Sequence, residues 1–161
     1  MSEYSGLGGE YVEIPFEVLK EEWNTYLMED GSVIRARAVL LRIRLQPDSR
    51  QGRFQTTLDV QNILMVSAPT NLRGKATEPP TMDEVLYPAR YGVAVRVLQG
   101  EERYNVYRVM PKGPVFKTKM VASDMAFRLT GRYDSDGQPV YVLQTSLAVM
   151  SPPGSRIEFS T

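Results

Sequence analysis

Residues 33–45 read VIRARAVLLRIRL, a segment in which apolar and arginine side chains alternate. Ile34, Ala36 and Ala38 are apolar at even positions, and arginines stand between them. Alternation with a period of two is typical of a strand that buries one face and exposes the other. The segment therefore predicts a long strand in a sheet with one apolar face.

The alternation changes phase partway along this segment. Beyond Val39 and Leu40 the apolar residues are Leu41, Ile43 and Leu45, which stand at odd positions. A straight strand cannot keep both sets on one face, because its side chains alternate strictly. We therefore predict a bulge or bend near Val39 and Leu40, of the kind found where a strand turns a barrel corner or switches sheets.

Further strands are expected on both sides of this segment. Asp30-Gly31 and Asp136-Gly137 each lie between apolar stretches, where glycine accepts the positive φ of a tight hairpin turn. The two hairpins resemble each other only as turns, and the chain shows no convincing internal repeat. The other expected strands span residues 10–14, 54–61, 91–99, 104–110, 115–121, 125–132, 139–150 and 156–159, and residues 63–66 either extend the second of these or start another.

Two short helices are predicted. Phe16, Leu19 and Trp23 follow Pro15 at helical spacing, which predicts about two turns of amphipathic helix. Thr81 and Glu84 match a capping box, and Pro88 ends the second helix within two turns.

These elements predict an all-β fold, a barrel or two-sheet sandwich of about eight to ten strands with two short helices. Residues 1–9 are expected to form a flexible N-terminal arm, because they hold three glycines and one large aliphatic side chain. Residues 10–150 are expected to form a single β-rich domain, and residues 151–161 a C-terminal extension.

The composition excludes several kinds of chemistry. The 161 residues contain no cysteine and no histidine, which removes disulfides, thiol nucleophiles, Ser-His-Asp triads and Cys or His metal sites. Nineteen basic residues balance nineteen acidic ones, which argues against a dedicated nucleic-acid binder. We predict no cofactor and no metal, and we expect no signal peptide and no transmembrane segment.

Two patterns could mark a site. Asp134 and Asp136 suggest calcium, but glycine falls at the fourth loop position rather than the sixth, so a hairpin turn is the better interpretation. Arginine beside tyrosine recurs along the chain, and single-stranded nucleic-acid binders combine such residues. The candidate ligand-binding residues of this kind are Arg103, Tyr104, Tyr107 and Arg132.

The leading hypothesis is a non-enzymatic structural or assembly protein, a subunit of a larger symmetric complex, in the cytoplasm or in a virion. A viral capsid decoration or tail component would fit, by analogy of architecture. Its partners would be protein subunits, as a homo-oligomer or docked on a larger protein shell. A membrane is not expected, and the neutral charge argues against nucleic acid. The candidate interface residues in the two terminal segments are Tyr4, Leu7, Ile157 and Phe159.

The alternative hypothesis is an OB-like module that binds single-stranded nucleic acid or carbohydrate through the four arginine and tyrosine residues. It requires their side chains to converge on one groove. An enzyme is the third interpretation, and it would need a buried carboxylate with a raised pKa in a cleft.

Overall fold

The alternating segment forms most of the first strand of a long β-hairpin. In a computed structural model, which describes residues 11–48, 53–151 and 158–160, β4 (Val33–Asp48) pairs antiparallel with β5 (Arg53–Ser67). The register shifts between Leu40 and Arg42, so the predicted bulge is confirmed, centred on Leu41. The buried residues change there from even positions up to Leu40 to Ile43 beyond it. One bulge thus keeps both halves of β4 facing the same core.

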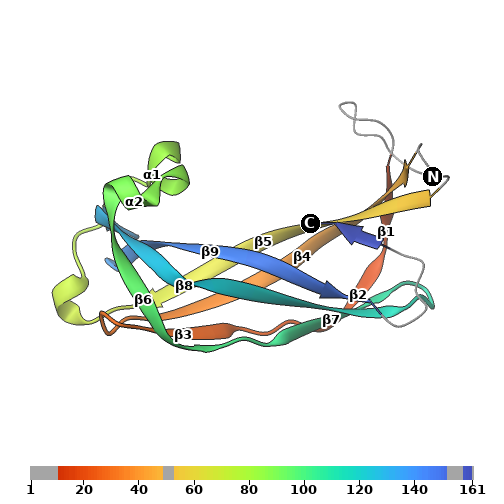
Figure 1. Cartoon of the computed structure of the whole chain (residues 1–161), viewed down its shortest axis with the longest axis horizontal. Coiled ribbons are helices and arrows are strands. Elements are labelled where there is room, and N and C mark those ends of the chain that lie inside the picture. The colour runs from red at the N-terminus through yellow and green to blue at the C-terminus, as the bar shows by residue number, and fades with distance from the viewer. Residues whose placement is uncertain (1–10, 49–52, 152–157, 161) are drawn as a thin grey trace.

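The remaining elements confirm an all-β fold (Figure 1). The described part of the chain holds ten strands, one 3₁₀ turn and two short helices. Besides β4 and β5, the elements are β1 (Val12–Ile14), β2 (Phe16–Lys20), β3 (Asn24–Met28), the 3₁₀ turn (Thr70–Leu72), α1 (Met82–Leu86), α2 (Pro88–Tyr91), β6 (Gly92–Glu101), β7 (Tyr104–Val109), β8 (Val115–Tyr133), β9 (Pro139–Met150) and β10 (Glu158–Ser160).

One predicted helix is wrong. Residues 16–20 form β2, which pairs antiparallel with β7, and its register shifts between Val18 and Lys20. Phe16 packs edge-on against Tyr107, while Leu19 is exposed. Three apolar residues at helical spacing also suit an irregular strand, and here the neighbouring strand supplies the backbone hydrogen-bond partners.

Pairing joins the short strands into longer ones. β1 and β3 pair with opposite ends of β4, while β2 and β3 pair with β7 and β6. The run β1–β2–β3 is therefore one interrupted strand between β4 and the run β6–β7. The run β6–β7 lies in turn along one edge of β8, which the sequence had suggested as two strands, and β9 lies along the other edge.

The chain consequently consists of two similar units, each a three-stranded meander. The first unit is β1–β3, β4 and β5; the second is β6–β7, β8 and β9. Their first strands pair antiparallel at the centre of the sheet. Each unit also has a register irregularity in its second hairpin, between Leu40 and Arg42 in the first and between Ala122 and Ala126 in the second.

A short sequence repeat underlies this arrangement, contrary to the expectation that no segment repeats. Residues 21–26 read EEWNTY and residues 102–107 read ERYNVY, which share the pattern Glu-x-aromatic-Asn-x-Tyr. Each segment spans the break in the first strand of its unit: residues 21–23 connect β2 to β3, and residues 102–103 connect β6 to β7. Only the Glu, Asn and Tyr positions are identical between the two segments. That similarity was too small to identify from the sequence, and the matching strand order revealed it.

The two asparagines of this pattern tie the units together reciprocally. Asn24 and Asn105 are both buried, and each donates to a backbone carbonyl in the second strand of the other unit. The distances are 2.9 Å from Asn24 Nδ2 to Met120 O and 3.1 Å from Asn105 Nδ2 to Ala38 O. Each Oδ1 accepts a backbone N–H from the other unit, at 2.9 Å from Arg103 N and 2.8 Å from Glu22 N.

The tyrosines of the pattern bind carboxylates of the pattern in the same reciprocal way. Tyr26 OH donates to Glu102 Oε2 at 2.9 Å, and Tyr107 OH donates to Glu21 Oε2 at 2.8 Å. Burial, followed by the hydrogen bond to a carboxylate, raises the pKa of both phenols. Tyr26 lies in one hydrophobic cluster and Tyr107 in the other, so each unit contributes an equivalent tyrosine to the core.

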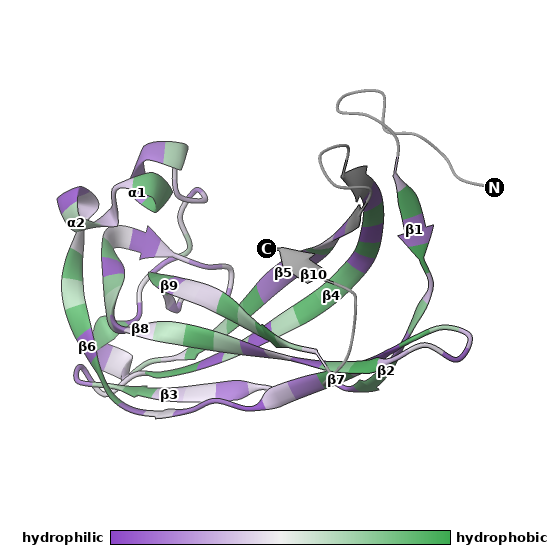
Figure 2. Ribbon diagram, turned by 45° about the vertical axis from the view of Figure 1, so that its right-hand side comes forward, coloured by the Kyte–Doolittle hydropathy of each residue, from purple (hydrophilic) through white to green (hydrophobic). Residues whose placement is uncertain are grey.

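The outer strands of the two units meet without closing the barrel. Asn62 Nδ2 of β5 donates to Thr145 Oγ1 of β9 at 3.1 Å, and no backbone pairing joins these two strands in the described part of the chain. β10 adds in parallel to β5 at residues 55–57. Figure 2 shows the sheet strongly curved, with the helices at one end and β1 at the other.

We expect both asparagines to matter equally for stability. Asn24→Ala and Asn105→Ala should each lower the free energy of unfolding by about 2–3 kcal/mol, because each leaves buried backbone groups without partners. Urea denaturation measures this. Asn62→Ala is the control, and since that side chain is exposed its cost should stay below about 1 kcal/mol. Losses below about 1 kcal/mol at both buried sites would contradict the proposed role.

Candidate interaction surface

Helix α1 begins at the capping box expected from the sequence. Thr81 Oγ1 accepts a hydrogen bond from Glu84 N at 3.3 Å, and Glu84 Oε1 accepts one from Thr81 N at 3.0 Å. The helix ends at Leu86, and Pro88 begins α2. The local sequence thus accounts for where α1 starts and stops.

The orientation of α1 is the reverse of that of an ordinary surface helix. Such a helix buries its apolar stripe and exposes its charges. Here Glu84 is the buried residue, at 7% exposure, whereas Met82 is 70% and Leu86 is 59% exposed. The carboxylate therefore faces the body of the protein, and the apolar side chains face outward.

Arg132, near the end of β8, holds the carboxylate in place. Its Nη2 lies 2.7 Å from Glu84 Oε1 and its Nε lies 3.0 Å from Glu84 Oε2, which makes the contact bidentate. Nη1 also donates to the carbonyl of Glu78 at 3.2 Å. The guanidinium, together with the hydrogen bonds from Thr81, lowers the pKa of Glu84 to about 2. The Glu84–Arg132 ion pair thus holds α1 against β8, and the exposed apolar side chains of α1 contribute little to this contact.

Six exposed apolar or aromatic side chains gather on and around the two helices, and we call this set the helical patch. Its members are exposed apolar or aromatic residues of α1, of the linking residue, of α2 and of the start of β6, namely Met82, Val85, Leu86, Tyr87, Tyr91 and Val93. The helices stand clear of the strands at one end of the molecule (Figure 1). Clusters of exposed apolar side chains mark interaction sites in soluble proteins.

A second polar cluster lies at the Asp30-Gly31 turn. Tyr141 OH donates to Asp30 Oδ2 and lies 2.9 Å from Ser32 Oγ, and Arg128 Nη1 lies 2.7 Å from Asp30 Oδ2. Burial, followed by the hydrogen bond to Asp30, raises the pKa of Tyr141 to about 12. Because Ser32 is fully buried, this cluster ties the β3–β4 turn to β8 and β9 and offers no hydroxyl to a substrate.

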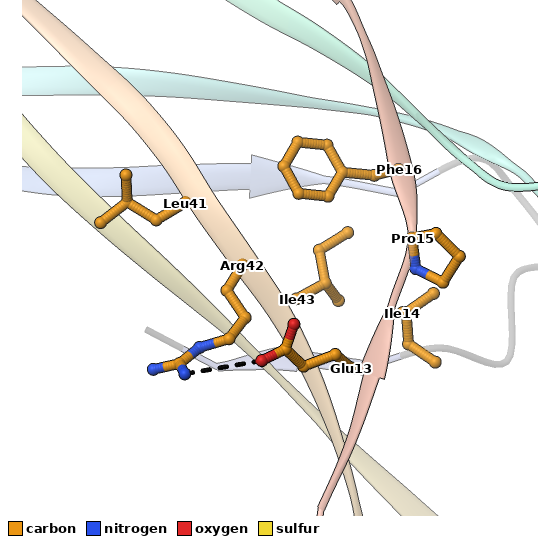
Figure 3. A pocket seen from close by; sticks show the side chains of 7 residues that line it. All are labelled: Glu13, Ile14, Pro15, Phe16, Leu41, Arg42 and Ile43. Atoms are coloured by element: carbon orange, nitrogen blue, oxygen red, sulfur yellow. Dashed lines mark ion pairs between the residues drawn. The ribbon is translucent and has the colours of Figure 1, made fainter. Parts of the chain in front are cut away.

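Described residues line two hollows that are candidate sites. The larger, of about 430 Å³, lies where β1 passes into β2 beside the bulge of β4 (Figure 3). Glu13 and Arg42 form an ion pair of 3.7 Å across its rim, and its floor is apolar. The smaller, of about 240 Å³, lies at the seam between β5 and β9. Within the described residues, neither hollow brings two carboxylates together, and no group of three acidic side chains is placed to hold a metal.

The residues proposed for an interface fall mostly outside the described residues. Tyr4, Leu7 and Ile157 lie there, so the structure does not place them. Phe159 lies in β10, where its backbone pairs with Thr56 of β5. That pairing links the C-terminal segment to the first unit of its own chain.

The four residues proposed for ligand binding do not share a groove. Tyr107 is buried in the core, and Arg132 holds Glu84 beside α1. Arg103 pairs with Glu22 at 2.8 Å and also contacts Glu101. Tyr104 is exposed on the outer face of the sheet.

Comparison of the chain with family models, with curated proteins and with solved structures finds no match. None of the described helices is long and apolar enough to cross a membrane.

The helical patch was missed in the sequence although its helix was found. The capping box located α1, but it does not reveal which side of the helix the sheet covers. A usable signal was present. Met82, Val85 and Leu86 form one stripe at i, i+3 and i+4, with Glu84 on another side of the helix. Only the position of Arg132 in space shows that the carboxylate side is the one that docks.

Removing the guanidinium should change how α1 responds to acid. Glu84 has a depressed pKa, so its contribution is present above the ordinary value of 4.5 and is lost as the pH falls toward about 2. In Arg132→Gln the pKa of Glu84 should rise toward 4.5, and α1 should loosen at correspondingly higher pH. Carboxyl NMR titration and amide exchange at Val85 measure this. Arg90→Gln is the control. An unchanged pKa of Glu84 in Arg132→Gln would contradict the role of Arg132 in holding the carboxylate.

Proposed function

We propose that this protein is a non-enzymatic assembly subunit that associates with further copies of itself through the helical patch. The observation that supports this most strongly is the reversed orientation of α1. Its carboxylate is bound inward by Arg132, while Met82 and Leu86 stand in solvent. Exposed apolar surface is unfavourable in water, and association with another protein removes it.

A second copy suits the patch because the charges at its two ends are opposite. Asp83 stands at the start of α1 and Arg90 near the end of α2, and both are exposed. Neither forms an ion pair with another described residue, although Arg90 lies 5.0 Å from the Tyr87 ring. In a twofold contact whose axis crosses the line from Asp83 to Arg90 at right angles, the two copies of the patch run antiparallel, so Asp83 of each would face Arg90 of the other.

The solution mass of the protein tests this proposal. We expect light scattering over a concentration series to give at least twice the monomer mass of 18.2 kDa. Met82→Glu/Leu86→Glu should give the monomer mass, because charges would be buried in the contact. Leu98→Glu is the matched control, since Leu98 is equally exposed but lies along β6, away from the helices. A wild-type protein that stays at 18.2 kDa throughout would refute self-association.

Charge-reversal variants of Asp83 and Arg90 test whether the partner is a second copy of this chain. Asp83→Arg alone, or Arg90→Asp alone, should weaken association a few-fold, because two exposed ion pairs worth about 0.5 kcal/mol each are lost and like charges meet. The double variant Asp83→Arg/Arg90→Asp should restore the wild-type mass profile. A double variant weaker than either single variant would contradict the twofold arrangement.

A further inference from the structure

The duplicated segment also places one aromatic side chain of each unit on the outer face of the sheet. Trp23 precedes the buried Asn24, and Tyr104 precedes the buried Asn105. Tyr104 alternates with the buried Asn105 along β7, so its ring lies on the outer face. The Trp23 ring packs against Arg35, an exposed residue between the buried Ile34 and Ala36 of β4, and therefore lies on the same face. Their strands are adjacent: Lys20 pairs with Val106, and Thr25 pairs with Glu101. The two rings therefore stand within about one residue of each other in register.

Each ring is flanked by two cations from the second strand of its own unit. The guanidinium carbon of Arg35 lies 4.8 Å, and that of Arg37 5.9 Å, from the Trp23 ring centre. In the second unit Lys119 Nζ lies 4.9 Å, and Lys117 Nζ 5.8 Å, from the Tyr104 ring centre. The same constellation of one ring and two cations thus occurs once in each unit.

Together the two constellations form a row across four strands, which we call the cross-strand row. From β4 to β8 it consists of Arg35 and Arg37, Trp23, Tyr104, and Lys117 and Lys119. Neighbouring strands are about 4.8 Å apart, so the row is about 14 Å wide. Aromatic rings occupy its centre and cations both ends.

The cations of the row are largely free of carboxylates. Arg37 pairs with Glu21 at 3.1 Å, but Arg35, Lys117 and Lys119 form no ion pair within the described residues. Opposite charges elsewhere on this sheet do find each other, as in the pairing of Arg42 and Arg44 with Asp59. The unpaired cations are therefore available to an anionic ligand.

We propose that the cross-strand row binds single-stranded nucleic acid. Proteins that bind single strands on a sheet face use aromatic side chains to stack bases and cations to hold phosphates. The row has both, with the rings central and the cations beside them. A double helix keeps its base faces stacked and cannot use the rings, and a base-free polyanion has nothing to stack on them. The neutral overall charge of the chain implies weak binding that depends strongly on salt.

This site is independent of the helical patch, because it uses other residues on the central strands. A Leu86→Glu variant is expected to keep nucleic-acid binding whether or not the protein self-associates. Loss of one activity therefore leaves the other testable.

A labelled twelve-nucleotide single strand, titrated at low and at moderate salt, tests the proposal. We expect a rise in anisotropy and quenching of Trp23, the only tryptophan in the chain. Lys117→Gln/Lys119→Gln should lower the affinity at least about fivefold and reduce the slope of log K against log salt by about 1.4, or 0.7 for each lost phosphate contact. Tyr104→Ala should weaken binding by a comparable factor through lost stacking.

Lys75→Gln/Lys112→Gln is the matched control, because it removes two exposed lysines outside the row. Its affinity should equal that of the wild type. The proposal is overturned if no strand binds at low salt, or if the row variant binds as tightly as this control. Equal binding of inorganic polyphosphate, without quenching of Trp23, would overturn the assignment to nucleic acid.

Discussion

The reciprocal hydrogen bonds of Asn24 and Asn105 hold the two halves of this protein in one sheet. Each asparagine lies in the first strand of its unit and reaches a backbone carbonyl in the second strand of the other. A buried amide gains from such bonds only when all its polar atoms find partners, so the position of each strand depends on the other.

The shared Glu-x-aromatic-Asn-x-Tyr pattern places buried polar groups in equivalent pairs. Tyr26 and Tyr107 are the equivalent phenols, and Glu102 and Glu21 are their acceptors. These carboxylates also accept backbone N–H groups, from Ala122 in one unit and Leu40 in the other. In each unit the carboxylate thus satisfies a backbone group close to the register irregularity of the second strand, where ladder bonding is interrupted.

The helical patch and the cross-strand row differ in whether the charged side chains beside them are paired. At α1, Arg132 neutralises the only buried acidic side chain of the helix, and the apolar residues are left outward. On the central strands, cations lie beside aromatic rings and mostly lack carboxylates. The Glu84–Arg132 ion pair leaves the apolar side chains of α1 exposed. The cross-strand row instead keeps unpaired cations beside its aromatic rings.

Much of the local structure could be predicted from the sequence, because the cause lies within a few residues. The alternation of residues 33–45 determined a strand with a bulge, the two Asp-Gly pairs determined hairpin turns with positive φ at Gly31 and Gly137, and Thr81 with Glu84 determined the start of α1. The all-β class followed from these signals. Residues 16–20 were misassigned because helical spacing over three apolar residues does not exclude an irregular strand.

What the sequence could not determine depends on residues far apart in the chain. Glu84 and Arg132 are 48 positions apart, and only their contact shows which side of α1 meets solvent. Trp23 and Tyr104 become neighbours because their strands pair, and that pairing depends on the two asparagines. Strand order is decided by long-range hydrogen bonds and burial, which leave little trace in the periodicity of any one segment. The sequence by itself therefore determined the all-β class and most of the elements, and the tertiary structure decided which side chains lie together on the surface.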